Sequence, residues 1–157
     1  MKNSSILFMF SGLFCTMFKI GNFKYMPGTL GSIIGIIIGF FLKDILPLTF
    51  YILIIFLISL IAVIMINIYQ IRVGSKEDRS EIIIDEFIGQ QIPLFFIELN
   101  VFNILLSFMF FRFFDILKIF PANYIDRKFK SSYGIIADDL VAGVQALAII
   151  YIINIYI

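Results

Sequence analysis

Leu48–Ile66 carries no charged residue and is apolar almost throughout. A helix needs about 20 consecutive, mostly apolar residues to cross the hydrocarbon core of a bilayer. This stretch has that length, and the polar residues Asn67 and Gln70 follow it. We therefore predict a transmembrane helix over Ile45–Tyr69.

The composition of the whole chain places it among integral membrane proteins. Of its 157 residues, 61% are hydrophobic and 15% are charged, and the mean hydropathy is +1.05. Soluble domains carry about 25% charged residues. The length suits one compact, all-α helical bundle, so we expect residues 1–157 to form a single membrane-embedded domain. A net charge of +1 gives no basic field for nucleic acid.

The residue types exclude several kinds of chemistry. Cys15 is the single cysteine and lies in an apolar run, which excludes a disulfide framework and a cysteine metal site. Histidine is absent, so the commonest general base near neutral pH is missing. Catalysis must therefore use carboxylates, Lys, Arg, Ser, Thr or Tyr, or a hard cation held by oxygen ligands.

Five further apolar segments are predicted to be helical. Ile6–Phe18 is too short to span and is expected to be buried or interfacial. Within Gly31–Leu42, three glycines recur every four residues, the pattern that lets membrane helices approach closely. The remaining segments are Glu81–Ile97, in which Pro93 should kink or end the helix, Val101–Phe111 and Ile135–Ile157.

The loop Gly21–Ser32 leads into the helix that contains the glycines. Pro27 suits a first helical turn, and the hydroxyls of Thr29 and Ser32 can cap backbone N–H groups. A helix N-terminus with hydroxyls beside it is a natural cradle for phosphate. An ordinary capped start of a membrane helix explains the same residues, and this loop alone does not decide between the two.

Acidic residues stand in or beside three of the apolar helices, where a bare charge is costly and marks a functional site. They are Asp85, Glu86, Asp115, Asp138 and Asp139. The segment Phe111–Asp139 also holds the basic residues that suit phosphate, namely Arg112, Lys118 and Arg127. Lys128 and Lys130 are interpreted as membrane-surface anchors.

Charge asymmetry predicts that these motifs meet at one face of the membrane. The basic segments Lys19–Lys24, Arg72–Arg79 and Arg112–Lys130 are expected to be cytoplasmic. Gly31–Leu42 would then cross outward and Ile45–Tyr69 would return. Glu81–Phe111 would form a hairpin or re-entrant excursion, and Ile135–Ile157 would cross outward again.

Clustered acids repel one another unless a cation neutralises them, and Mg²⁺ suits oxygen-only ligands. Acids, bases and a glycine–hydroxyl loop at a membrane face indicate metal-assisted phosphate chemistry on a lipid. Two alternatives remain from the residues alone. A small transporter or channel subunit would use the acids as ion or proton sites distributed through the bilayer, whereas a structural assembly subunit would leave the acids without a purpose.

Five motifs, in this order along the chain, resemble those of the phosphatidylglycerophosphatase A family. They are PGTLGS at Pro27–Ser32, IIIDEFIGQ at Ile82–Gln90, FRFFDILK at Phe111–Lys118, DRK at Asp126–Lys128 and GIIADDLVAG at Gly134–Gly143. The resemblance implies an all-α enzyme of the bacterial inner membrane, multi-pass, with its active site facing the cytoplasm. It implies Mg²⁺-dependent hydrolysis of phosphatidylglycerophosphate to phosphatidylglycerol and inorganic phosphate.

The motif match also implies roles for single residues. The catalytic and metal-binding set would be Asp85, Glu86, Asp115, Asp138 and Asp139. The phosphate-binding set, which we infer from residue chemistry, is Thr29, Ser32, Arg112, Lys118 and Arg127. Either an activated water or one aspartate attacks phosphorus, and the sequence does not choose between them. The expected partners are the lipid substrate and the bilayer, without nucleic acid and without an obligate protein partner.

Overall fold

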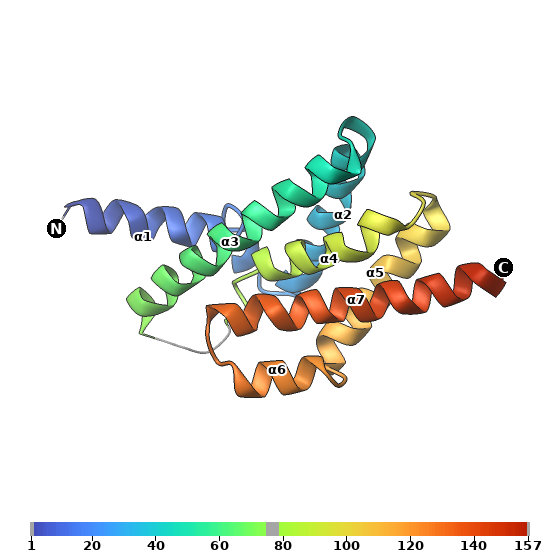
Figure 1. Ribbon diagram of the computed structural model, residues 1–157. Helices are drawn as coiled ribbons and strands as arrows, with labels where there is room; N and C mark the ends of the chain where they lie inside the picture. The colour runs from blue at the N-terminus through green and yellow to red at the C-terminus, as the bar shows by residue number, and fades with distance from the viewer. Residues whose placement is uncertain (1, 75–78, 157) are drawn as a thin grey trace.

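The computed structural model describes residues 2–74 and 79–156, and within them every regular element is helical (Figure 1). The predicted all-α fold is confirmed. The elements are α1 (Lys2–Cys15), the 3₁₀ turn η1 (Ile20–Asn22), α2 (Pro27–Ile45), α3 (Leu48–Val73), α4 (Ile84–Phe96), α5 (Val101–Leu117), α6 (Ala122–Lys128) and α7 (Ser132–Tyr156).

Helix α4 lies at the centre of the bundle and contacts α2, α3, α5 and α7 (Figure 1). Ten of its 13 residues are buried, among them charged and amide side chains. A helix that is buried on several sides cannot keep one polar face for solvent. The polar residues of α4 must therefore find partners inside the protein, and this requirement shapes the site.

Glycines allow the neighbours of α4 to approach its backbone. Gly31, Gly35 and Gly39 are buried on α2, and a Cβ atom on any of them would contact α4. This confirms the predicted packing face of that helix. On the other side, a Cβ atom on Gly143 of α7 would collide with the backbone of Gly89 in α4. The crossing of α4 and α7 therefore depends on small residues, as is usual between membrane helices.

Among the residues that the structure describes, three helices have the length and composition to cross a membrane, namely α2, α3 and α7. Their bounds differ slightly from prediction: Ile45 ends α2 rather than beginning α3, and α7 starts at Ser132 rather than Ile135. The 13 residues of α4 rise only about 20 Å, less than the hydrocarbon thickness of about 30 Å. This short helix is consistent with the predicted hairpin or re-entrant excursion.

The predicted helix over Glu81–Ile97 begins later than expected. Helix α4 starts at Ile84, so Glu81 and Asp85 do not share a helix face. The reason is that the chain before α4 is tied to the end of α1, because the Ile83 N–H donates to the Cys15 carbonyl at 3.0 Å. Glu81 instead accepts a hydrogen bond from Tyr69 at 2.6 Å. Pro93 lies inside α4, which ends three residues later at Phe96.

Candidate metal and phosphate site

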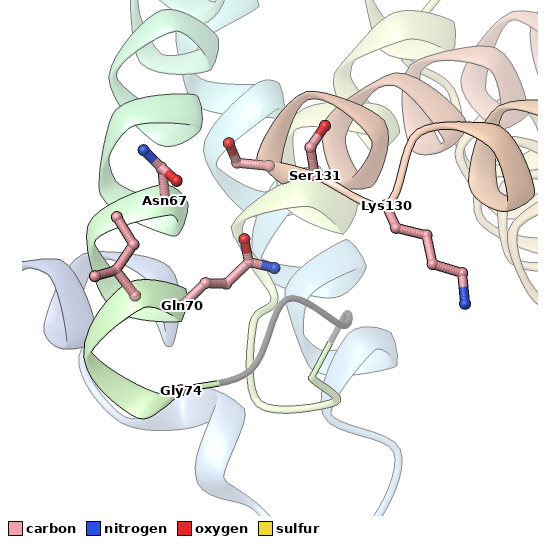
Figure 2. Close-up of a pocket in the computed structure, with 7 residues that line it drawn as sticks. Asn67, Gln70, Gly74, Lys130 and Ser131 are labelled. Atoms are coloured by element: carbon pink, nitrogen blue, oxygen red, sulfur yellow. The ribbon is translucent and has the colours of Figure 1, made fainter.

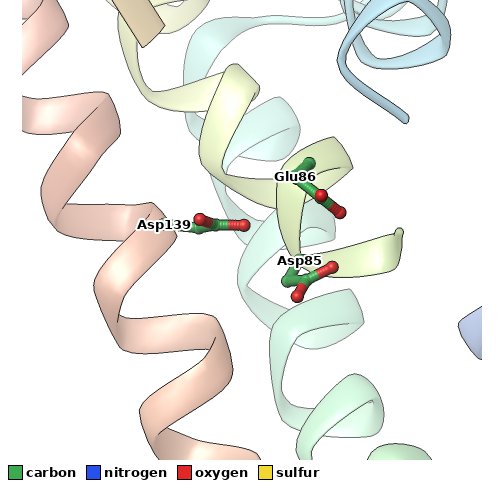
Figure 3. A group of neighbouring side chains, drawn as sticks. All are labelled: Asp85, Glu86 and Asp139. Atoms are coloured by element: carbon green, nitrogen blue, oxygen red, sulfur yellow. The ribbon is translucent and has the colours of Figure 1, made fainter. Parts of the chain in front are cut away.

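Three of the predicted acids converge where α4 crosses α7. Asp85 and Glu86 occupy the first turn of α4, and Asp139 reaches toward them from α7 (Figure 3). One carboxylate oxygen from each residue lies within 4.8 Å of the other two. These three side chains, called the acid cluster below, are brought together by the close crossing at Gly89 and Gly143.

The acid cluster is largely buried. Asp85 and Asp139 are 4% and 5% exposed, and Glu86 is partly buried. Carboxylates this close repel one another in a low-dielectric interior, and protonation or a bound cation relieves the repulsion. The donor atoms are all carboxylate oxygens, the ligand type that Mg²⁺ prefers. The residues present therefore fit a hard divalent cation.

Helix α5 adds a base and a fourth acid beside the cluster. Arg112 forms an ion pair with Asp115 and lies 3.9 Å from Glu86. The carboxyl group of Asp115 is within hydrogen-bonding reach of Asp139. Among the residues that the structure describes, the buried Nε of Arg112 has no hydrogen-bond partner. Arg112 thus retains a donor for an anion at the edge of the cluster.

The first turn of α2 closes the cluster from another side. A Cβ atom on Gly28 would collide with the Glu86 carboxylate and lie 3.1 Å from the Arg112 guanidinium. The helix start at Pro27 agrees with prediction, but the predicted capping by hydroxyls does not. Met26 is the N-cap residue, and no side chain caps the helix. Ser32 is buried and donates to the Gly28 carbonyl at 3.1 Å.

Asp138 is outside the acid cluster and forms an ion pair with a lysine. Its carboxylate lies 2.6 Å from the Lys118 ammonium, which also lies 2.6 Å from Asp126. Burial lowers the pKa of Lys118, but hydrogen bonds and charge attraction from Asp126 and Asp138 outweigh it and raise that pKa above its usual value. Lys118 therefore stays protonated and ties α7 to α6 and to the end of α5.

The remaining predicted binding residues lie at different depths. Thr29 is partly buried in the first turn of α2. Arg127 is exposed on α6 and lines a shallow surface pocket to which none of the five predicted acids contributes. The structure thus gathers Asp85, Glu86 and Asp139, sets Arg112 and Asp115 beside them, and leaves Arg127 at the surface.

A separate polar pocket of about 530 Å³ lies between the end of α3 and the start of α7 (Figure 2). Asn67, Gln70 and Lys130 contribute side chains to it, as Figure 2 shows. None of the five predicted acids lines it. This pocket is therefore distinct from the acid cluster.

Sequence reasoning gave no role to Asp126. This residue stands in a charged tripeptide that is typical of a solvated surface, and nothing in its local pattern indicates a lysine from another helix. Gly28 lies in the predicted loop Gly21–Ser32, but its neighbours Glu86 and Arg112 come from helices far along the chain, and the pattern of the loop does not indicate them.

Comparison with known proteins matches the family described as phosphatidylglycerophosphatase A over residues 13–154. A Haemophilus influenzae protein of that name is 35% identical over 87% of this chain and 84% of its own length. Its Escherichia coli namesake is 33% identical over 87% of this chain and 79% of its own length. A Bacteroides thetaiotaomicron protein named putative phosphatidylinositol-3-phosphatase is 30% identical over 96% and 95% of the two chains. No solved structure matches. The motifs, the helical fold and these matches together show that the chain belongs to the phosphatidylglycerophosphatase A family.

Proposed function

We propose that this protein hydrolyses phosphatidylglycerophosphate to phosphatidylglycerol and inorganic phosphate, and that the reaction depends on Mg²⁺. The observation that carries the proposal is the acid cluster of Asp85, Glu86 and Asp139 with Arg112 beside it. The names of two relatives support this substrate, and the name of the third also describes a phosphatase of a lipid phosphate.

The ion would be held by the acid cluster, with Asp115 beside it. When bound, Mg²⁺ polarises a phosphoryl group and neutralises the charge that develops on it. Asp138 belongs to the predicted ligand set, but its ion pair with Lys118 gives it a second role, which is to hold that lysine in place. The oxygen-only donors of the cluster support a hard cation over a transition metal.

Arg112 is the residue best placed to bind the phosphate. Its guanidinium is planar and can donate two parallel hydrogen bonds to phosphate oxygens. Its ion pair with Asp115 holds the Arg112 side chain in place, so that the side chain loses little conformational entropy when the anion binds. Lys118, Thr29, Ser32 and Arg127 complete the predicted phosphate-binding set, with Lys118 supplying a point charge.

The reaction adds water across the phosphoester bond. A water oxygen forms a bond to phosphorus, the bond from phosphorus to the glycerol oxygen breaks, and that oxygen leaves with a proton as the alcohol of phosphatidylglycerol. A carboxylate of the cluster can accept the proton of the attacking water. Alternatively, one aspartate attacks phosphorus first, and water then cleaves the acyl phosphate. Arg112 stabilises the charge on the phosphoryl oxygens in both routes.

We propose that the site faces the cytoplasm and that the protein lies in a bacterial inner membrane. The basic loops of the chain support this orientation through the positive-inside tendency. The convergence of the acids also weighs against a transporter, because ion pathways distribute such groups through the bilayer. Here three of the five acids meet at one crossing of two helices.

The deciding experiment is phosphate release by the purified protein in mixed micelles. We expect release from phosphatidylglycerophosphate with Mg²⁺, complete loss with a chelator, and recovery when excess Mg²⁺ is added back. Phosphatidylinositol 3-phosphate is assayed in parallel, because one relative carries that name. Chelator-insensitive release would refute the metal dependence, and release from the inositol lipid alone would refute the substrate.

A further inference from the structure

An apolar groove of about 490 Å³ opens between α3, α4 and α7. Ile55, Ser59 and Val63 of α3 form one wall, and Ile136 and Ala137 of α7 form the other. Ile92 of α4, together with Phe95, lies between them. Its volume falls in the range of about 300–1,000 Å³ that is typical of small-molecule sites.

The lining offers hydrocarbon almost exclusively. Ser59 is the one aliphatic hydroxyl among the lining residues, and it already donates to the Ile55 carbonyl of its own helix at 2.8 Å. The inner wall is buried, with Ile55 and Ile136 both 3% exposed, whereas Phe56 at the rim is 57% exposed. The groove is thus closed on the protein side and open at the surface. It lies between two helices of membrane-spanning length, so its opening faces the hydrocarbon of the bilayer.

The groove and the acid cluster are built on the same two helices, α4 and α7. Ile92 follows Asp85 by two helical turns, so both side chains lie on nearly the same face of α4. Ile92 also packs against Gly143, where a Cβ atom would lie 2.9 Å from the Ile92 Cβ. Gly143 lies one turn beyond Asp139 on α7. Each of the two helices that build the cluster therefore also lines or supports the groove.

We propose that this groove holds one acyl chain of the lipid substrate while its phosphate lies at the acid cluster. The inference rests on the proposed function, which places a phosphomonoester of a two-chain lipid at the cluster. A lipid bound there must direct its chains into the hydrocarbon, and the apolar groove adjoins the cluster on α4 and α7. Apart from the hydroxyls of Ser59 and Tyr133, its lining is apolar, which suits an alkyl chain and not a polar ligand or a peptide backbone.

The groove orients the bound lipid. A lipid tail is already in apolar surroundings, so its transfer from bilayer to protein yields little hydrophobic free energy. A seated chain instead fixes the rotation and depth of the headgroup, and a misplacement of about 1 Å can cost a large factor in rate. Blocking the groove should therefore lower the turnover of a long-chain substrate and leave the turnover of a short-chain substrate unchanged.

The test is a groove-filling variant, Ser59→Phe, assayed on palmitoyl and hexanoyl forms of phosphatidylglycerophosphate in mixed micelles. The matched control is Leu57→Phe, because Leu57 is exposed on α3 and does not line the groove. We expect Ser59→Phe to lower kcat/KM for the palmitoyl lipid by about tenfold or more, while the hexanoyl lipid and the control variant stay near wild-type values.

Equal loss on both lipids would mean a general distortion of the protein, and no loss on either would mean an unused groove. Both results overturn the proposal while leaving the phosphatase assignment intact. If the wild-type protein released no phosphate from either lipid, the proposed function would fail, and the assignment of the groove to its substrate would fail with it.

A second measurement does not depend on turnover or on the folding of a variant. The wild-type protein is photolysed with a non-hydrolysable phosphonate analogue of the substrate that carries a diazirine near the end of one acyl chain. We expect adducts on the groove residues of α3 and α7, and their loss when excess unlabelled substrate is present. The proposal would be overturned if the adducts were spread over the lipid-facing surface, like those of a diazirine phosphatidylcholine, and if unlabelled substrate did not reduce them.

Discussion

Asp138 and Asp139 are consecutive on α7, so their side chains leave the helix about 100° apart. That angle separates their environments. Asp139 joins Asp85 and Glu86, whereas Asp138 pairs with Lys118 at 2.6 Å. Adjacent residues of the same type therefore serve different purposes, because one faces the α4 crossing and the other faces α6 and the end of α5. We expect Asp139 to bind the proposed cation and Asp138 mainly to hold Lys118 in place.

Asp139→Asn should lower phosphate release by about 10²–10³-fold, because an amide supplies neither the charge nor the basicity of the carboxylate at the cluster. The measurement is kcat for phosphatidylglycerophosphate, with membrane insertion and thermal unfolding recorded alongside. Asp44→Asn is the matched control, since Asp44 is exposed at the end of α2. Wild-type turnover in Asp139→Asn would remove this residue from the catalytic set.

At the scale of single residues, the members of the acid cluster could be predicted from the sequence and their geometry could not. Charge inside apolar helices identified all five acids, and the family motifs agreed with them. The division between Asp138 and Asp139 depends on which helix faces each side chain. On a continuous helix the spacing of three would place Lys118 on the face of Arg112 and Asp115, but it ends α5 in a left-handed conformation and pairs with Asp126 and Asp138.

Among the helices, α4 depends most on its surroundings. It is short, it carries two of the three clustered acids at its N-terminus, and its C-terminus ends inside the protein. Lys43 of α2 satisfies backbone carbonyls at that C-terminus. Its ammonium donates to the carbonyls of Leu94, Phe95 and Ile97 at 2.9, 3.1 and 2.5 Å. An ammonium has three donors, and all three are used. A cation at this end also complements the helix dipole.

Lys43→Met should lower the free energy of unfolding by about 1–3 kcal/mol, because carbonyls at the end of α4 lose their donor in partly buried surroundings. Thermal unfolding in detergent measures the effect. We expect activity to fall as well, since α4 carries Asp85 and Glu86 at its other end. Lys24→Met is the control, because Lys24 is exposed in the loop before α2. Equal unfolding temperatures for the two variants would contradict this role.

In the sequence, Lys43 stands just before Asp44 and Pro47, and nothing in this pattern indicates its partners. Its partners lie more than 50 residues further along the chain, and backbone carbonyls leave no trace in a sequence pattern. The same limit applies to the start of α4. The periodicity continued back to Glu81, but a hydrogen bond from Ile83 to the end of α1 holds the preceding residues outside the helix.

At the scale of the whole molecule, three long helices pack against the shorter α4. Helices α2, α3 and α7 can span a bilayer, and α4 is too short to do so. Apolar length predicted α3, whereas the short segment Gly31–Leu42 of α2 was assigned a crossing from charge asymmetry. The central position of α4 could not be predicted in this way, since its burial depends on contacts with four other helices. The arrangement gives the acid cluster a fixed depth relative to the ends of the long helices.

The orientation of this arrangement can be tested with single cysteines, because the chain has only Cys15 and that residue is buried. In a Cys15→Ala background, Lys130→Cys and Asp44→Cys introduce exposed thiols at the start of α7 and the end of α2. Positive-inside topology predicts that a membrane-impermeant maleimide labels position 44 in intact spheroplasts and position 130 only after the membrane is opened. Both positions lie outside the acid cluster, so phosphate release by each variant confirms that the labelled protein is folded.

Labelling of position 130 in intact spheroplasts would place the basic loops outside and contradict a cytoplasmic site. Labelling of both positions from one side would contradict a crossing by α3 that is followed by a returning excursion of α4 and α5.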